Sequence, residues 1–479
     1  MGMASPSGCS KKRPQNLAAG SFGNRPLSLC QAGYERKKYA FSFVLSLHFS
    51  LRFQGILRIL YNDKKGKKAV LRKGRNKMNV VERFLKYVSF DTASDELSPS
   101  CPSSKKQWNL ARFLENEMQE MGFARVRLDE NGYVYGVIEG NDPSLPAIGL
   151  IAHMDTVDSV PTDCPKARII HYEGGDIVLN EEKGILMQEK DFDCLPHDKG
   201  CDLIVTDGTT LLGADDKAGV AEILTFCEFV LAHPEKKHGK ICVGFTPDEE
   251  IGRGANLFDV ENFGADFAYT LDGGAAEEIE YENFNGASAK LIVHGVSIHT
   301  GTAKNKLRNA AVMAMEFHGM LPAQETPECT EGYEGFYHLC EMKGDVTEAE
   351  LRYIVRDHDK QKFEQRKAYM QRAADYLNAK YGENTFELTV KDSYYNMREK
   401  VEERMEVVEK ALAALSACGL SPKCVPIRGG TDGARLSFMG LICPNLGTGG
   451  RNFHGVYEYA NVQEMETMVE VMKKLVLAE

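Results

Sequence analysis

The stretch LLGADDKAG, residues 211–219, places a glycine and two adjacent aspartates between an apolar segment and a helical pattern. Four other short segments also put polar residues at the end of an apolar run: AHMDT (152–156), PDEE (247–250), LDGG (271–274) and NFHG (452–455). Together they supply two histidines and several carboxylates, and no cysteine. Oxygen ligands mixed with imidazole suit zinc, manganese or cobalt, and a shared carboxylate suits two such ions at a hydrolytic site.

The apolar runs in front of these segments predict the fold. Residues 147–152, 240–246 and 268–272 have the length and apolar character of buried strands, and helical patterns cover residues 105–121 and 216–231. Strands that alternate with helices predict an α/β domain with a mostly parallel sheet flanked by helices. Because ligands bind at the carboxyl ends of such strands, we expect the polar segments to converge there.

The first part of this domain carries clear local signals. Residues 80–88 form an amphipathic helical pattern, and Gly122 predicts the end of the following helix. Asn131 and Gly132 predict a tight turn that joins two short strands, residues 126–128 and 133–138, in a hairpin.

The pattern changes near residues 284–286. Strands are predicted at 288–294, 351–357 and 385–390, and helices at 305–320 and 360–381. This order predicts an inserted α+β domain of ferredoxin-like type. Helical α/β patterning then returns, and the chain closes with a helix over residues 462–477, capped by Asn461.

Residues 1–77 differ from the rest of the chain. They hold ten lysines and seven arginines against two acidic residues, whereas the whole chain carries a net charge of −11. Their apolar-rich part, residues 39–61, is interrupted by Arg52 and Arg58 and is too short and too charged to span a bilayer comfortably. We expect a disordered or non-native extension, with a targeting segment as the alternative.

The charge and the cysteines bound the partners and the compartment. The strongly acidic remainder of the chain disfavours nucleic acids and anionic membranes as partners. Thirteen cysteines are scattered without a CxxC pair, which predicts reduced thiols and a cytoplasmic location. Disulfides in a secreted enzyme are the alternative. The sequence leaves the oligomeric state open.

His153 and Asp155 stand two residues apart at the end of a predicted strand, which places both side chains on one side. Asp155 could then accept the second ring N–H of His153 and fix its tautomer, as carboxylates do for metal-bound histidines. Taken alone, the pair is better explained by a capped turn. Asp215 could bridge two cations, although two acidic residues at a helix start also suit the helix dipole.

Glu249 and Glu250 are adjacent at the end of a predicted strand, so their side chains point in different directions. One can bind a metal while the other moves protons as a general base. A solvated acidic turn is the alternative for this pair alone. Asp272 is a candidate terminal ligand and His454 a candidate imidazole ligand. The coincidence of all these positions in one α/β pattern favours a metal site.

At these residues the chain resembles the peptidase T family, tripeptide aminopeptidases among the co-catalytic di-zinc exopeptidases. That wider group includes glutamate carboxypeptidases, aminoacylases and succinyl-diaminopimelate desuccinylases. The likeness runs from residue 78 to residue 479. Beyond the metal motifs it covers VERFLKYVSFDT (81–92), ETPECTEGYEGFYHL (325–339), DSYYNMREKV (392–401) and IRGGTDGARLSFMG (427–440).

The resemblance implies a peptidase that uses two zinc ions, with cobalt or manganese as possible substitutes, to remove the first residue of a short peptide. The implied ligands are His153 and Asp272 for one zinc, Glu250 and His454 for the other, and Asp215 between them. Glu249 is implied as the general base, and Asp155 as the residue that orients His153. The inserted domain would act as a lid.

In the lid, the resemblance implies that His299 helps to stabilise the oxyanion and that Arg356 and Asn309 bind polar groups of the substrate. Gly430 and Thr431 would line the pocket. The chain departs from the family at residues 299–301, where HTG replaces the usual HPG, which puts the shape of that loop in question.

The predicted division is an extension (1–77), the first part of the catalytic domain (78–285), the lid (286–391) and the second part of the catalytic domain (392–479). A related di-zinc dipeptidase, carboxypeptidase or N-acyl amino acid deacylase is the alternative within the same group. A peptide-binding scaffold without catalysis is the alternative outside it.

Overall fold

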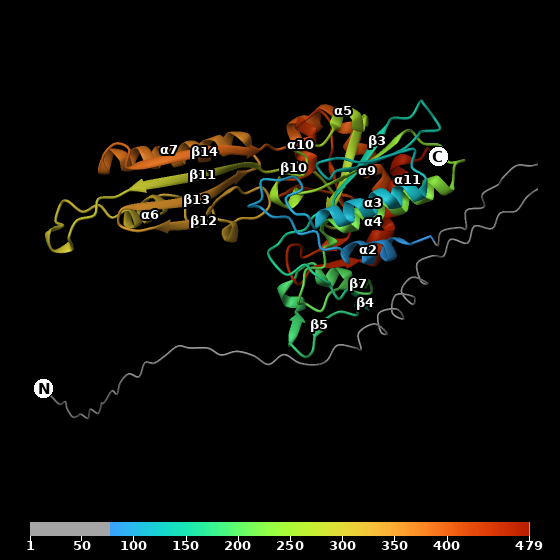
Figure 1. Ribbon diagram of the computed structural model, residues 1–479, viewed down its shortest axis with the longest axis horizontal. Coiled ribbons are helices and arrows are strands. Elements are labelled where there is room, and N and C mark those ends of the chain that lie inside the picture. The colour runs from blue at the N-terminus through green and yellow to red at the C-terminus, as the bar shows by residue number, and fades with distance from the viewer. Residues whose placement is uncertain (1–76, 479) are drawn as a thin grey trace, which may run out of the picture. The chain divides into compact units, whose positions relative to one another are not determined.

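The computed structural model describes residues 77–478. The predictions for the basic extension lie, apart from Lys77, outside the described residues. A sheet with the strand order β1-β2-β8-β3-β9-β16-β10-β15 forms the centre of the larger domain (Figure 1). Its strands are β1 (Arg125–Leu128), β2 (Val134–Ile138), β3 (Ile148–His153), β8 (Ile241–Thr246), β9 (Phe267–Gly273), β10 (Glu278–Asn283), β15 (Lys423–Ile427) and β16 (Asn445–Gly447).

The central strands of this sheet are parallel, as predicted: β8 pairs with β3, β3 with β9, and β9 with β16. β1 and β2 form the predicted antiparallel hairpin at one edge. All residues of β3 and β8 are buried, because helices cover both faces of the sheet. The prediction of an α/β domain with a mostly parallel, helix-covered sheet is therefore confirmed.

The two faces of the sheet have separate cores because side chains alternate along a strand. Leu150 and Val243 face one core, and Ile151 and Cys242 face the other. The first core contains residues of α2 (Val80–Val88), α3 (Gln107–Met121), α4 (Ala214–Ala232), α9 (Met405–Ala417) and α11 (Val462–Val476). The second includes residues of α5 (Val260–Phe263) and α10 (Asp432–Phe438).

The caps that the sequence indicated are present. Gly122 ends α3 with a φ of 98°, a left-handed conformation that suits glycine. The Asn461 side chain accepts hydrogen bonds from the backbone N–H groups of Gln463 and Glu464 at the start of α11.

A small sheet that the sequence did not predict has the order β17-β18-β7-β4. Its strands are β4 (Arg168–His171), β7 (Asp202–Val205), β17 (Gly450–Arg451) and β18 (Tyr459–Asn461), and a hairpin of β5 (Ile177–Asn180) and β6 (Ile185–Met187) lies between β4 and β7 in the chain. His454 belongs to the loop between β17 and β18. The small sheet therefore fixes both ends of the loop that carries this predicted ligand.

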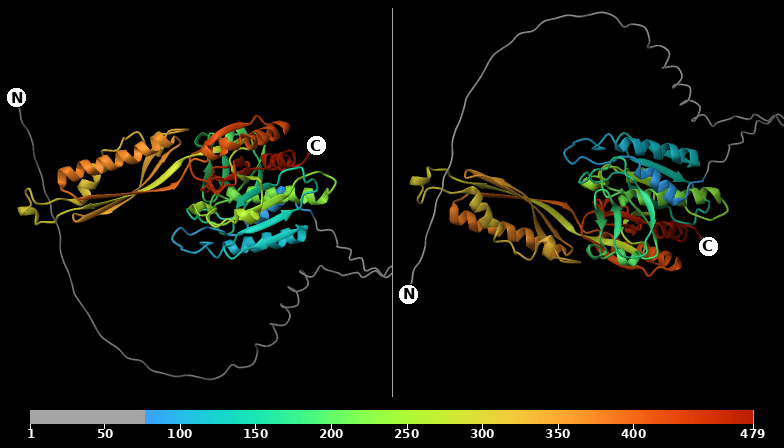
Figure 2. Two further views of the ribbon diagram at one scale, coloured as in Figure 1. Left: turned by 90° about the horizontal axis from the view of Figure 1, so that it is seen from above. Right: turned by 90° about the horizontal axis from the view of Figure 1, so that it is seen from below.

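The inserted domain extends from one side of the larger domain (Figure 2). It has its own antiparallel sheet with the order β12-β13-β11-β14 and its own core. Its elements follow one another as β11 (Asn285–His294), α6 (Ala310–His318), β12 (Phe336–Gly344), β13 (Glu348–Asp357), α7 (Lys360–Tyr381) and β14 (Phe386–Tyr394). This is the predicted ferredoxin-like arrangement. β12 was not predicted, and α6 begins later than expected because Asn309 caps it.

Among residues 77–478, no helix has both the length and the apolar character needed to cross a membrane.

Candidate metal centre

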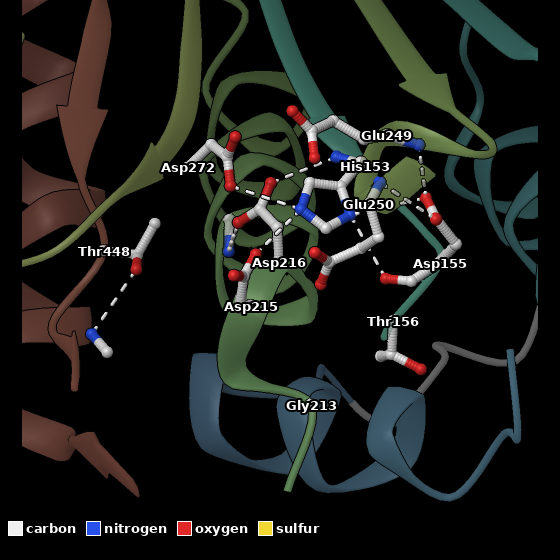
Figure 3. A network of polar contacts seen from close by, with 12 residues as sticks. His153, Asp155, Thr156, Gly213, Asp215, Asp216, Glu249, Glu250, Asp272 and Thr448 are labelled. Atoms are coloured by element: carbon white, nitrogen blue, oxygen red, sulfur yellow. Dashed lines mark hydrogen bonds and ion pairs between the residues drawn. The ribbon is translucent and has the colours of Figure 1, made fainter. Parts of the chain in front are cut away.

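Four of the five predicted metal ligands lie together at the carboxyl end of the central sheet (Figure 3), namely His153, Asp215, Glu250 and Asp272. His153 is the last residue of β3, Asp272 lies near the end of β9, and Glu250 follows β8. Asp215 lies at the start of α4, where its backbone is not yet helical. His454 reaches the same place from the loop between β17 and β18, where its φ is 65°.

Asp215 joins two groups of these ligands. Its Oδ1 lies 2.8 Å from His153 Nε2, which is also 3.3 Å from Asp272 Oδ1. Its Oδ2 lies 3.0 Å from His454 Nε2, which is also 3.0 Å from Glu250 Oε2. One carboxylate thus offers one oxygen to each histidine–carboxylate pair, which is the arrangement that two ions sharing a ligand require.

The donor set fits divalent cations. It combines imidazole nitrogens with carboxylate oxygens, as zinc sites do. Glu250 Oε1 is buried and has no hydrogen-bond partner among the described residues, so it has an unused lone pair inside the cluster. His153, Asp215 and Glu250 place ligand atoms within 4.8 Å of one another. A cation between them would satisfy these atoms and offset the repulsion between the carboxylates.

The pKa values of the two histidines also indicate a cation site. Hydrogen bonds to Asp215 and Glu250 raise the pKa of His454 to about 11. Burial lowers the pKa of His153, but the carboxylate of Asp272 and the hydrogen bonds to Asp155, Asp215 and Asp272 outweigh it and raise that pKa well above its usual value. In the metal-free protein at neutral pH, protons therefore occupy the places that cations would take.

Zinc binding to the metal-free protein is expected to release protons, because a histidine ligand must be neutral. Since His454 is protonated below a pH of about 11 in the metal-free protein, the apparent zinc affinity should rise with pH across the neutral range. Titration of the full chain with zinc in a weakly buffered indicator solution measures the release. His338→Gln, at an exposed histidine, serves as the control. Zinc uptake without proton release would contradict the assigned ligands.

Glu249 lies beside the cluster but belongs to neither of the two groups of potential ligands that the structure contains. Burial raises the pKa of its carboxyl group well above the ordinary value, and the neighbouring Asp272 carboxylate raises it further. Glu250, the adjacent residue, lies within the cluster. Glu250 thus lies within a group of potential ligands and Glu249 lies outside both groups, and the metal-binding and general-base roles of the pair stay predictions.

Asp155 contacts His153 in a different way from the prediction. The short contact of His153 Nδ1, at 3.1 Å, is with the backbone carbonyl of Asp155, and the carboxylate oxygen is 3.5 Å away. The carboxylate instead accepts hydrogen bonds from the backbone N–H groups of Glu249, at 2.9 Å, and Glu250, at 3.2 Å. This difference arises because β3 ends at His153, so strand alternation does not extend to Asp155. Asp155 thus fixes the turn that presents both glutamates.

Asp216 was not predicted to have a role of its own. Its two oxygens accept hydrogen bonds from the backbone N–H groups of His153, at 3.0 Å, and Gly219, at 3.2 Å. It therefore ties the start of α4 to the end of β3, although it could also serve as a ligand together with His153 and Asp272.

Glu458 is a second residue that the sequence did not indicate. Its side chain is buried, and one oxygen accepts hydrogen bonds from the N–H groups of Leu212, at 3.1 Å, and Gly213, at 2.7 Å. The other accepts from the N–H of Asp215, at 3.1 Å. Glu458 thus fixes the turn that aims Asp215, and it follows His454 by four residues. The only feature of the sequence that could have indicated a role for Glu458 is its position four residues after the candidate ligand His454.

Glu458→Gln is expected to weaken zinc binding by about 10- to 100-fold, the usual effect of losing a residue that orients a ligand. The amide places an NH₂ group against backbone N–H donors, so the turn must shift. Competition with a chromophoric chelator measures the affinity, and Glu466→Gln, at an exposed position of the neighbouring α11, is the matched control. Unchanged affinity in Glu458→Gln would show that the turn holds Asp215 without it.

The structure does not bring His299 and Asn309 to the cluster. Both belong to the segment after β11, and β11 is a ten-residue strand, about 33 Å long, that begins at the connection to the larger domain. His299 is exposed, and its ring accepts a hydrogen bond from Gly301 N. Asn309 accepts one from Val312 N as a helix cap. A sequence motif does not show how far the preceding strand places its loop from the rest of the site.

Arg356 and Gly430 lie closer to the connection between the domains. Arg356, near the end of β13, pairs with Gly286, the second residue of β11. Gly430 and Thr431 immediately precede α10, and the Thr431 hydroxyl is buried without a partner among the described residues. These three predicted substrate residues are thus found at the domain connection, whereas the two predicted in the loop after β11 are not.

A known protein family matches the inserted domain, and solved structures match both domains. Residues 281–385 match the family model described as a peptidase dimerisation domain. Among solved structures, an aminopeptidase PepT from Bacillus cereus aligns with a TM-score of 0.65 at 22% identity, over 84% of this chain and 98% of that one. A tripeptidase from Staphylococcus aureus aligns with a TM-score of 0.66, also at 22% identity and the same coverage.

Curated relatives are much closer in sequence. Peptidase T of Caldanaerobacter subterraneus is 54% identical over 399 residues, which are 83% of this chain and 98% of that protein. Peptidase T of Aliivibrio fischeri is 54% identical over 398 residues, 83% of this chain and 97% of that protein. The aligned residues extend over nearly the whole of these relatives. This chain is therefore a peptidase, and it belongs to the peptidase T family.

Proposed function

We propose that this peptidase removes the N-terminal residue from tripeptides at a centre of two divalent cations, most suitably zinc. The arrangement that carries the proposal is the Asp215 carboxylate, which offers one oxygen to each of two histidine–carboxylate pairs, with Glu249 outside both pairs. The aminopeptidase and tripeptidase among the structural neighbours support the reaction. A dinuclear metal-binding peptidase of the M20 family, from Bacillus subtilis, shares the fold with a TM-score of 0.55.

In this proposal His153 and Asp272 would hold one cation, Glu250 and His454 the other, and Asp215 both. When bound, the cations would lower the pKa of water toward 7 and polarise the scissile carbonyl. The site is built from the two parts of the chain predicted as catalytic, residues 78–285 and 392–479. The Glu458 carboxylate and the small sheet would hold the ligands of the two parts at fixed positions relative to each other.

Glu249 would act as the general base and then as the acid. It takes a proton from the attacking water and delivers it to the leaving amine, and its raised pKa suits a group that must do both near neutral pH. Arg356, Gly430 and Thr431 would contact the substrate near the domain connection. His299 and Asn309 would have to be brought to the site, by closure of residues 286–391 as a lid or by a second copy of the matched dimerisation domain.

The same centre would serve a dipeptidase, a carboxypeptidase or an N-acyl amino acid deacylase. Those enzymes differ in which end of the substrate is held, not in the cations or the base. The relatives at 54% identity are peptidase T, which favours the tripeptide reaction. The eleven cysteines of the described residues are all free, which supports a reducing compartment such as the cytoplasm.

The proposal is tested on the full chain with a tripeptide of three different residues. With zinc supplied, the free first residue and the remaining dipeptide should appear together, as identified by mass. Removal of the metal with a chelator should stop the release, and addition of zinc should restore it. Release that is unaffected by the loss of all bound metal would overturn the metal-centre proposal.

A further inference from the structure

Arg356 has a charge that nothing in the described structure neutralises. Its Nη1 donates to the backbone carbonyls of Val355, at 3.1 Å, and Ala287, at 3.3 Å. Within residues 77–478 it forms no ion pair with a carboxylate, whereas Arg366, on the helix that follows, pairs with both Asp357 and Glu325. A long, uncommitted arginine side chain needs another means of being held in one orientation, because its rotamer freedom is large.

Tyr394 supplies that support across the sheet. Gly286 of β11 pairs with Arg356 of β13 on one side and with Tyr394 of β14 on the other. Because Gly286 has no side chain, the two flanking side chains meet above it, and the Arg356 guanidinium lies 5.0 Å from the centre of the Tyr394 ring. A Cβ atom at Gly286 would lie 2.7 Å from Tyr394 Cζ and 2.9 Å from Arg356 Nη1. The contact therefore depends on the glycine.

A second glycine covers the ring from the larger domain. A Cβ atom at Gly430 would lie 3.0 Å from Tyr394 Cε1 and 3.2 Å from Cζ. The ring thus touches Gly286 of the inserted domain and Gly430 of the IRGG segment in the larger domain. The close approach of the Tyr394 ring thus explains why position 430 is occupied by a glycine, which its predicted place in the pocket did not explain.

The ring also lies within electrostatic reach of the proposed base. Burial raises the pKa of the Tyr394 phenol; the Arg356 guanidinium lowers it, and the Glu249 carboxylate raises it. The phenol is therefore neutral at physiological pH and interacts electrostatically with both the Arg356 guanidinium and the Glu249 carboxylate.

We propose that Tyr394 is a positioning residue of this peptidase, which holds the Arg356 guanidinium against its ring so that the arginine faces bound peptide beside Glu249. This inference rests on the proposed function, since it assigns Arg356 to the peptide. The ring stabilises the orientation through its face, which attracts a cation, and the two glycines hold the ring in place. Because the Arg356 side chain is already ordered in the free protein, it loses less conformational entropy when the peptide binds.

The test is a double-mutant cycle with a tripeptide on the full, zinc-loaded chain. Tyr394→Leu should raise KM about tenfold, in keeping with a partly desolvated cation–aromatic contact, and should leave kcat within about twofold. Tyr394→Phe should restore KM to within about twofold of the wild type, because it keeps the ring. Tyr376→Leu, at an exposed tyrosine of α7, should leave both constants unchanged.

The cycle separates positioning from general support of the fold. In the Arg356→Ala background, Tyr394→Leu should change KM by less than about twofold, because the arginine it would hold is gone. Gly286→Ala keeps both Tyr394 and Arg356 in the sequence but pushes their side chains apart, because its Cβ atom would clash with both. It should therefore raise KM as Tyr394→Leu does. Additive effects of Tyr394→Leu and Arg356→Ala, or loss of zinc from Tyr394→Leu, would overturn the inference. Failure of the wild type to release the first residue would instead overturn the proposed function.

Discussion

Glu249→Gln is expected to lower kcat for a tripeptide by about 10³-fold while both cations remain bound. Glutamine has nearly the same size and can still occupy the space beside the cluster, but it cannot take a proton from water or return one to the leaving amine. General acid–base groups typically contribute 10²- to 10⁴-fold, and Glu249 would serve in both directions. Steady-state kinetics together with metal analysis of the same sample measures the two quantities.

The neighbouring residue provides the matched comparison. Glu250→Gln changes the same chemical group one position away, but Glu250 Oε2 lies 3.0 Å from His454 Nε2, within the ligand cluster. We expect this variant to lose cation affinity as well as activity. If Glu249→Gln retained substantial turnover, another group would be the base. If it lost its cations as Glu250→Gln does, Glu249 would be a ligand.

Asp215→Asn is expected to abolish both cation binding and activity. The asparagine retains one oxygen, so it cannot serve both histidine–carboxylate pairs, and its NH₂ group must face one of the imidazoles. In the metal-free protein, burial raises the pKa of Asp215, but the hydrogen bonds from His153 and His454 outweigh it and keep the pKa well below its ordinary value. The carboxylate is thus ionised whether protons or cations occupy the cluster.

The expected loss of zinc affinity exceeds the 10- to 100-fold that is typical of residues that only orient a ligand. Calorimetric titration with zinc measures it, with Asp193→Asn at an exposed position as the control. Two equivalents of zinc bound with wild-type affinity in Asp215→Asn would show that Asp215 does not bridge, and would favour Asp216, which also lies within reach of His153 and Asp272.

The sequence predicted the main elements because their signals are local. An apolar run that stops at a polar residue marks the end of a buried strand, and His153, Asp272 and the two glutamates follow from that signal together with the meeting of parallel strands at one edge. The ferredoxin-like order of the inserted domain follows in the same way from alternation and helical periodicity.

What the sequence missed depends on contacts between distant segments. β4 and β7 are short strands in a polar region, and they become strands because they pair with each other and, through β18, with the end of the chain. Glu458 binds the backbone of residues more than 240 positions away. The separation of His299 from the cluster, and the meeting of Arg356 with Tyr394 above a glycine, follow from sheet register, which no motif records.

The aminopeptidase activity is tested most directly by comparing a free tripeptide with its N-acetyl form, using the full chain with zinc and identifying the products by mass. We expect release of the first residue from the free tripeptide, with a dipeptide as the second product, and no cleavage of the acetylated peptide. Release of the last residue, or cleavage of the acetylated form at a similar rate, would contradict an aminopeptidase and indicate a carboxypeptidase or a deacylase at the same centre.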